Sequence, residues 1–217
     1  MCASRAQAVF DPDCRRCPRL SDFLKQVAAE HPDYYARPVP AFGDPSARLL
    51  IVGLAPGMHG ANRTGRPFTG DYAGILLYRT LHELGFGNRP VSESADDGLK
   101  LTDCRISNAV KCLPPQNKPQ TDEIRNCNVF LQAELAALPE GAVILALGKI
   151  AHDAVLRAVV KPLSAYRFAH AAEHVLERHH LLDSYHCSRY NTQTRRLSGD
   201  MFRDVVRRAR ELIDAAS

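Results

Sequence analysis

Short apolar runs alternate with stretches of helical periodicity along most of the chain. Each apolar run is bounded by polar or turn-forming residues, which predicts a buried strand. The runs cover residues 47–54, 103–112, 142–148 and 179–188. Apolar residues at helical spacing between and around these runs predict helices. The helical stretches cover residues 20–30, 73–86, 121–138, 149–160 and 199–214.

Strands that alternate with helices favour a parallel sheet covered by helices on both faces. We therefore expect a single three-layer α/β/α domain over residues 1–217, with a central, mostly parallel four-stranded sheet. Ligands of such sheets bind beyond the carboxyl ends of the strands. Polar segments follow three of the predicted strands, so we expect them to converge in one cleft. These segments are residues 53–71, 108–112 and 186–191.

The helix expected over residues 121–138 has the clearest start. Thr121 is its predicted N-cap, and Asp122 and Glu123 lie in its first turn, where carboxylates interact favourably with the helix dipole.

Composition adds few constraints. The chain has 217 residues, of which 45% are hydrophobic and 24% charged, and its net charge of +4 permits an anionic partner. No run of 18 apolar residues is present and the first residues do not resemble a signal peptide, so we expect a cytoplasmic protein without a membrane span. In that reducing compartment the seven cysteines are not expected to form disulfides.

A glycine-rich segment, IVGLAPGMHGANRTGRPFTGDYAG over residues 51–74, follows the first predicted strand. Such loops often hold phosphates, but no Lys-Ser or Lys-Thr pair follows a glycine here, and the spacing G-x-x-x-G-x-x-G differs from the dinucleotide fingerprint. Both nucleotide-binding motifs therefore fail. A surface loop that only turns the chain is the plain alternative.

Four cysteines have a spacing that suits a metal centre. Cys14 and Cys17 form a C-x-x-C pair, and Cys112 and Cys127 form a second pair in the middle of the chain. Four thiolates suit either zinc or a [4Fe–4S] cluster, and the spacing does not choose between them. Simple buried thiols are the alternative. That alternative is the expectation for Cys2, Cys104 and Cys187.

The segment YHCSRYNTQTRRLSG over residues 185–199 could present His186 beside Ser188 and Arg189 at a strand end. A single histidine is equally consistent with a surface or core role, and the chain has nine. No G-x-S-x-G nucleophile elbow occurs, which argues against a serine hydrolase.

Together, GLAPGMHGANRTGRPFTGDYAG (53–74), SNAVKCLPPQNKP (107–119), HCSRYNTQT (186–194) and the four cysteines resemble the uracil-DNA glycosylase superfamily. The match is with its family 5, the iron–sulfur type b enzymes, and it extends from Cys14 to about Ser198. The resemblance implies a monofunctional enzyme that removes uracil and other deaminated bases from double- or single-stranded DNA and leaves an abasic site. We expect it to be monomeric. It also implies a [4Fe–4S] cluster on the four cysteines, with zinc as the alternative.

The resemblance also assigns roles in the reaction. Family 4 carries Glu after the first glycine of the loop, and the cluster-free branches place Asp or Asn in this turn, whereas this chain has Leu54. Asp71, the nearest carboxylate, is therefore expected to stabilise the sugar cation or position the water. His186 is expected to donate a hydrogen bond to uracil O2.

The remaining expected contacts concern the base and the DNA. Phe68 would stack on the flipped base, and the Asn108 amide would read its O4 and N3–H edge. Gly53 and Ala55 complete the expected base pocket. The expected DNA contacts are Arg63, Lys118, Arg189, Tyr190 (as a wedge) and Asn191 (in a supporting role).

Three other classes of function remain to be weighed. An iron–sulfur electron carrier explains the cysteines but gives no role to residues 63–71 or 186–191. A phosphotransferase needs a lysine that the glycine-rich loop does not have. A DNA-binding module without catalysis would leave no abasic sites in uracil-containing DNA.

Overall fold

A six-stranded sheet forms the centre of the protein. The computed structural model describes residues 10–216. The strand order is β1-β3-β2-β4-β6-β5, in which the four inner strands are parallel and the two edge strands are antiparallel to their neighbours. The strands are β1 (Phe42–Gly43), β2 (Leu49–Gly53), β3 (Cys104–Asn108), β4 (Val143–Leu147), β5 (Glu173–Val175) and β6 (His180–Ser184).

The α/β class and the four parallel strands are confirmed, but the predicted count of four strands is wrong. The two strands that the sequence pattern missed, β1 and β5, have two and three residues. Segments this short cannot display a strand periodicity, and neither is fully buried.

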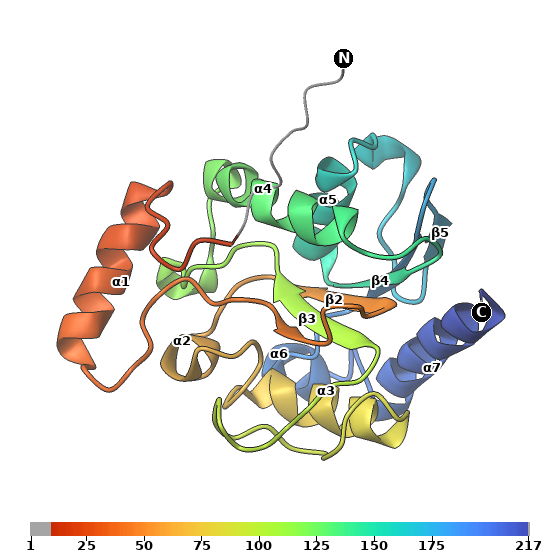
Figure 1. The fold of residues 1–217 in the computed structure, drawn as a ribbon, viewed down its shortest axis with the longest axis horizontal. Helices are drawn as coiled ribbons and strands as arrows, with labels where there is room; N and C mark the ends of the chain where they lie inside the picture. Colours follow the sequence, from red (N-terminus) through yellow and green to blue (C-terminus); the bar gives the residue numbers. More distant parts are fainter. Residues whose placement is uncertain (1–9, 217) are drawn as a thin grey trace.

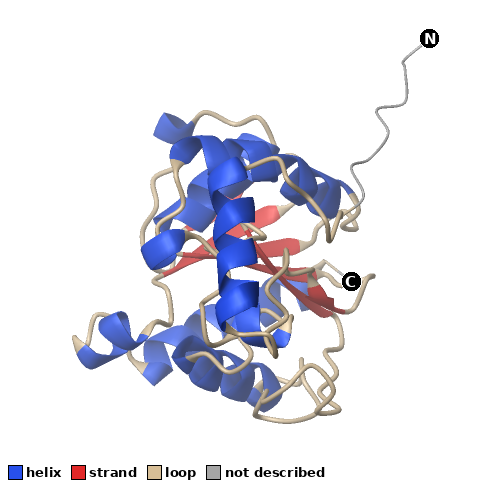
Figure 2. Ribbon diagram, turned by 90° about the vertical axis from the view of Figure 1, so that its left-hand side faces the viewer, coloured by secondary structure: helices blue, strands red, loops and turns tan. Residues whose placement is uncertain are grey.

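Helices cover both faces of the sheet, as Figure 1 and, turned by 90°, Figure 2 show. One face packs against α1, α4 and α5, and the opposite face packs against α3 and α7. The helices are α1 (Pro18–Glu30), α2 (Ala61–Thr64), α3 (Tyr72–Glu83), α4 (Thr121–Ala136), α5 (Lys149–Ala158), α6 (Arg189–Gln193) and α7 (Gly199–Ala215), with short 3₁₀ turns η1 (Pro115–Asn117) and η2 (Leu163–Ala165).

The core explains the continuous apolar runs of the sequence. Every residue of β2 and β4 is buried, because helices exclude water from both faces of these central strands. The strand β3 ends at Asn108 rather than at Cys112, so Cys112 lies in the connection that follows.

The start of α4 differs from the expectation. The N-cap is Gln120, not Thr121, because Gln120 and Glu123 form a reciprocal capping box in which the Gln120 N–H donates to Glu123 Oε2 at 2.7 Å. The buried Glu123 carboxylate also accepts two hydrogen bonds of 2.7 Å from Arg19 at the start of α1. This bidentate ion pair ties the first turn of α1 to the first turn of α4.

The chain order places a crevice beyond the carboxyl ends of the parallel strands. The connection from β2 leads to β3 on one side, and β4 then returns to the other side of β2. This reversal is a topological switch point, where open α/β sheets bind ligands. The glycine-rich loop leaves β2 at this point. Among the described residues, no helix has the length and apolar character needed to cross a membrane.

Candidate active site and cysteine centre

A cavity of about 390 Å³ opens beyond the carboxyl ends of β2, β3 and β6. Its walls include Ala55, Phe68 and Asp71 from the loop after β2, Asn108 from the end of β3, and His186 after β6. The volume is in the range of small-molecule sites. The predicted convergence of the three polar segments is therefore confirmed at these side chains.

Asp71 lies immediately before α3, with its carboxylate turned back against the glycine-rich loop. Its Oδ2 accepts a hydrogen bond of 3.2 Å from the Ala61 N–H. A Cβ atom at Gly60 would lie 1.9 Å from Asp71 Oδ1, and one at Gly57 would lie 2.6 Å from it. Any side chain at either glycine would therefore collide with the carboxylate.

The ionisation of Asp71 reflects this enclosed position. Burial raises the pKa of Asp71 above its ordinary value, although the Ala61 N–H and the charges of Arg63 and His59 act in the opposite direction. The carboxylate is thus weakly solvated and has a single protein hydrogen bond among those described. A carboxylate in this state interacts strongly with a nearby cation, because little water screens it.

Phe68 forms one wall of the cavity in an unusual backbone conformation. Its φ is +57°, and its side chain is only 6% exposed. The following helix accommodates this turn because position 74 is glycine: a Cβ atom there would lie 1.9 Å from the Phe68 carbonyl oxygen. The ring stacks on the His186 imidazole with a centroid distance of 5.8 Å and an interplanar angle of 27°.

Asn108 presents an unpaired acceptor beside this aromatic wall. The side chain is buried, and its Oδ1 has no hydrogen-bond partner among the described residues. A Cβ atom at Gly53 would lie 2.4 Å from Asn108 Oδ1 and 2.7 Å from Phe68 Cζ. Gly53 therefore contributes to the site by leaving room for these two side chains.

His186 completes the wall with a neutral imidazole. Burial lowers its pKa to about 4. Its backbone carbonyl accepts a hydrogen bond of 2.8 Å from Asn191 Nδ2, and Ser188 caps α6 by accepting from the Asn191 N–H. Asn191 thus positions the His186 loop through the backbone.

The rim of the cavity carries exposed aromatic and cationic groups. Arg189 lines the cavity and lies over the Tyr72 ring at 5.0 Å, while Tyr190 beside it is 71% exposed. Arg63 lies outside the cavity, in an adjoining groove that also includes Asp71, Tyr72 and Arg189.

Lys118 is exposed and lines neither the cavity nor this groove. Its neighbour Asn117 lines the cavity instead. The sequence interpretation gave no role to Asn117 or Tyr72, although Asn117 lies within the segment 107–119 and Tyr72 within the segment 53–74.

The four predicted metal-ligand cysteines converge at a second cavity. Cys14 and Cys17 approach it from the start of α1, Cys112 from the connection after β3, and Cys127 from the second turn of α4. The Lys111 N–H donates to Cys127 Sγ at 3.2 Å, and Asn126 Nδ2 donates to Cys17 Sγ at 3.9 Å. Hydrogen bonds to sulfur are typical of thiolates that hold a metal centre.

The chemistry of this donor set fits a metal centre. Burial raises the pKa of Cys17 and Cys112 above the ordinary thiol value, and it raises that of Cys127 to about 11. Buried thiolates need a compensating positive charge, which metal ions supply. In contrast, Cys104 and Cys187 are fully buried in the apolar core on the opposite face, as expected for plain thiols. Cys2 lies outside the described residues.

The comparisons with known proteins agree with this architecture. Residues 40–210 match the family model of the uracil DNA glycosylase superfamily. The chain is 49% identical over 205 residues to the type-5 uracil-DNA glycosylase of Thermus thermophilus, which covers 92% of this chain and 93% of that protein. It is 41% identical over 201 residues to the type-5 uracil-DNA glycosylase of Pyrobaculum aerophilum, which covers 91% and 88% of the two chains.

A more distant similarity extends to a second branch. The type-4 uracil-DNA glycosylase of Saccharolobus solfataricus is 34% identical over 137 residues, or 63% of this chain and 51% of that protein. The chain thus belongs to the uracil DNA glycosylase superfamily, within its type-5 family.

The ionisation of His186 can be measured directly. An exposed histidine titrates near 6.5, whereas burial lowers the pKa of His186 to about 4. Between these values the unfolded chain binds a proton at this position that the folded chain does not bind. The contribution of His186 to stability is therefore complete above pH 6.5 and decreases as the pH falls toward 4.

We expect the imidazole ¹³C resonance of His186, assigned by its absence in the His186→Gln variant, to shift with a midpoint near pH 4. A midpoint near the ordinary histidine value would contradict a desolvated, neutral ring.

Proposed function

We propose that this protein is a monofunctional DNA glycosylase that flips uracil out of DNA, hydrolyses its N-glycosidic bond and leaves an abasic site for base-excision repair. Other deaminated bases fall within the same proposal. Membership of the superfamily supports the reaction class. The observation that carries the proposal is the buried, unpaired Asn108 Oδ1 beside the ring of Phe68 in a cavity at the switch point.

The unpaired amide oxygen suits the pairing edge of uracil. A buried acceptor without a partner costs about 1–3 kcal/mol, and a ligand that supplies a donor removes this cost. The N3–H of uracil is such a donor, while Asn108 Nδ2 can donate to uracil O4. Phe68 offers the flat apolar surface on which a flipped base stacks.

His186 suits the charge that develops on the leaving base. Cleavage of the glycosidic bond transfers an electron pair to uracil, and negative charge gathers on its O2. Because the imidazole is neutral at physiological pH, it can keep its proton and donate a hydrogen bond to O2. The stacked Phe68 ring fixes the plane of the imidazole.

We expect Asp71 to stabilise the positive charge that develops on the sugar. The sugar becomes an oxocarbenium-like cation as the base departs, and an ionised carboxylate beside it stabilises that cation. The same carboxylate can orient the attacking water and accept a proton from it. Since this carboxylate is the only one that lines the cavity among the described residues, we assign both roles to Asp71.

We expect the exposed residues at the rim of the cavity to contact the DNA. Tyr190 would enter the space that the flipped nucleotide leaves, and Arg189, Arg63 and Lys118 would meet phosphates of single- or double-stranded DNA. Asn191 has a supporting role, because it holds the backbone carbonyl of His186.

We also propose that Cys14, Cys17, Cys112 and Cys127 hold a [4Fe–4S] cluster rather than zinc. All four side chains line one cavity, as the ligands of a single centre would. Four thiolates suit either group, and the resemblance to the iron–sulfur type b enzymes favours the cluster. The cluster would crosslink the start of α1 to α4, next to the Arg19–Glu123 ion pair. Excision is not a redox reaction, so the cluster has no part in the chemical steps.

An electron carrier is the alternative that the cysteines alone would allow. It gives no reason for a neutral histidine, an unpaired amide oxygen and a partly buried carboxylate around one cavity. We further propose that the enzyme acts as a monomer in the cytoplasm, where its thiols stay reduced.

Replacement of Asp71 tests the function and its assigned roles together. The wild-type protein is expected to produce abasic sites in a duplex with a single uracil, detected by alkaline cleavage of the strand. We expect Asp71→Asn to slow single-turnover excision by at least 100-fold, equivalent to about 3 kcal/mol of barrier.

The thermal stability of Asp71→Asn at pH 7 should equal or exceed that of the wild type, because burial makes ionised Asp71 costly to the fold. Asp96→Asn, which removes an exposed carboxylate in the connection to β3, is the matched control and should excise normally. Unchanged excision by Asp71→Asn would remove Asp71 from the reaction, and no abasic sites with the wild type would refute the function.

The cysteine centre has its own prediction. Protein purified without oxygen should be brown, with iron and acid-labile sulfide in equal amounts. Cys17→Ser should lose both, because it removes one ligand, whereas Cys104→Ala should keep both, because Cys104 lies in the opposite core. A colourless wild-type protein with one zinc ion per chain would contradict the cluster.

A further inference from the structure

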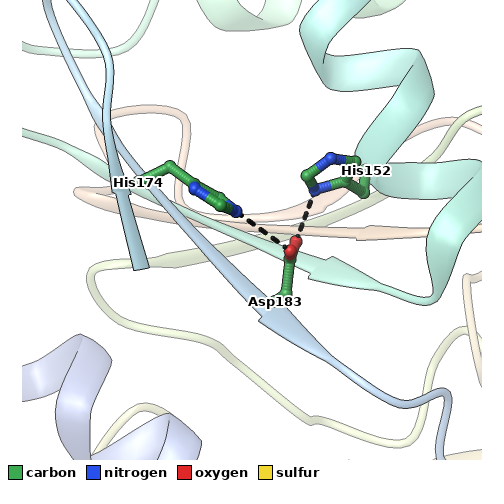
Figure 3. Close-up of side chains that lie close together, drawn as sticks. All are labelled: His152, His174 and Asp183. Atoms are coloured by element: carbon green, nitrogen blue, oxygen red, sulfur yellow. Dashed lines mark hydrogen bonds and ion pairs between the residues drawn. The ribbon is translucent and has the colours of Figure 1, made fainter. Parts of the chain in front are cut away.

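Three side chains far from the base pocket point toward one another at the other edge of the sheet (Figure 3). His152 comes from α5, His174 from the edge strand β5, and Asp183 from β6. None of them lines the base pocket or the cysteine cavity. No motif in the sequence relates these positions, and the proposed reaction gives them no role.

We propose that His152, His174 and Asp183 bind one divalent transition-metal ion, with zinc as the expected occupant. One ring nitrogen of each histidine and a carboxylate oxygen all lie within 4.8 Å of one another. Two imidazoles and one carboxylate form a donor set that zinc accepts, with a fourth position for water. This inference is independent of the proposed glycosylase activity.

A hydrogen bond outside the trio prepares His152 to act as a ligand. Its Nε2 donates to the Tyr166 carbonyl oxygen at 3.0 Å, so the second ring nitrogen, Nδ1, faces Asp183. Donation of the far N–H to a backbone carbonyl is the usual way in which proteins orient a metal-binding histidine. Binding of a metal ion at Nδ1 would therefore replace the proton of the 2.8 Å contact with Asp183 and leave the Nε2–H bond in place.

The distances within the trio are close to those of a metal site. A tetrahedral zinc ion with nitrogen and oxygen ligands separates the ligand atoms by about 3.3 Å. His174 Nε2 lies 3.4 Å from Asp183 Oδ2, and His152 Nδ1 lies 2.8 Å from Asp183 Oδ1. The shorter distance, between His152 and Asp183, is that of a hydrogen bond. A metal ion bound in place of the proton would increase this distance by about half an ångström.

Charge provides a second argument. Asp183 is fully buried, and a buried carboxylate needs a positive partner. Without a metal ion, the side-chain partners of Asp183 among the described residues are the two histidines, His152 at 2.8 Å and His174 at 3.4 Å. The two forms of the trio, metal site and ion pair, therefore make opposite predictions about metal affinity.

The location allows metal entry and suggests a structural purpose. His174 lies on a short edge strand, and 15% of its side chain is exposed, whereas the other two side chains are at most 1% exposed. An ion there would join α5 and the edge strand to β6, the strand that leads to His186 three residues beyond Asp183.

Metal content and thermal stability test the proposal on the full-length protein with its cysteine centre intact. The protein is dialysed against EDTA, loaded with zinc chloride, desalted and measured for zinc and iron by plasma mass spectrometry. We expect the wild type to retain one zinc ion per chain and to show a higher unfolding temperature with zinc than without it.

His174→Gln should lower zinc affinity by at least about 100-fold and abolish the thermal shift, with iron content unchanged. The matched control is His180→Gln, which replaces a histidine on β6 whose side chain is outside the trio. It should bind zinc as the wild type does.

The proposal would be overturned if the wild type retained no zinc, or if His174→Gln retained as much zinc as the wild type. Either result would identify the three side chains as an ion pair. If His174→Gln does not fold, Asp183→Asn replaces it in the same zinc measurement and should lose zinc. An anomalous signal at the zinc edge from wild-type crystals should then lie between the three side chains, and its absence there would overturn the proposal.

Discussion

The site depends on the absence of side chains at a few positions around the pocket. A Cβ atom would lie 2.4 Å from Asn108 Oδ1 at Gly53, 1.9 Å from Asp71 Oδ1 at Gly60, and 1.9 Å from the Phe68 carbonyl at Gly74. Real Cβ atoms do not approach other atoms so closely, so each glycine leaves space for one group of the site. A glycine-rich loop generally suggests that backbone approaches a ligand. Here its glycines instead leave space at the edge of the pocket for the Asp71 carboxylate, the Asn108 amide and the Phe68 carbonyl group.

Much of the fold follows from the sequence, because buried parallel strands are continuous apolar runs and their carboxyl ends share one edge. That logic predicted the meeting of Phe68, Asp71, Asn108 and His186, all of which line the cavity. It missed β1, β5, α2 and α6, since elements of two to five residues show no periodicity. It also misplaced the N-cap of α4, because a capping glutamine is less common than a threonine.

Other properties of the site have no signal in sequence. The positive φ of Phe68, the unpaired oxygen of Asn108 and the low pKa of His186 result from packing between segments far apart along the chain. The same holds for His152, His174 and Asp183, which α5 and the β5–β6 edge bring together. The cysteines are the opposite case, because their paired spacing already predicted a shared centre. The Arg19–Glu123 ion pair joins the first turns of α1 and α4, close to which Cys17 and Cys127 lie.

We propose that the space at Gly60 positions the Asp71 carboxylate for excision of uracil. Single-turnover excision by Gly60→Ala tests it most directly, with Gly87→Ala as the control because a Cβ atom there meets no atom closer than 3.5 Å. We expect Gly60→Ala to lose at least about 100-fold in rate, as removal of a catalytic electrostatic group does, while both variants still unfold cooperatively. Excision by a folded Gly60→Ala protein at the wild-type rate would contradict it.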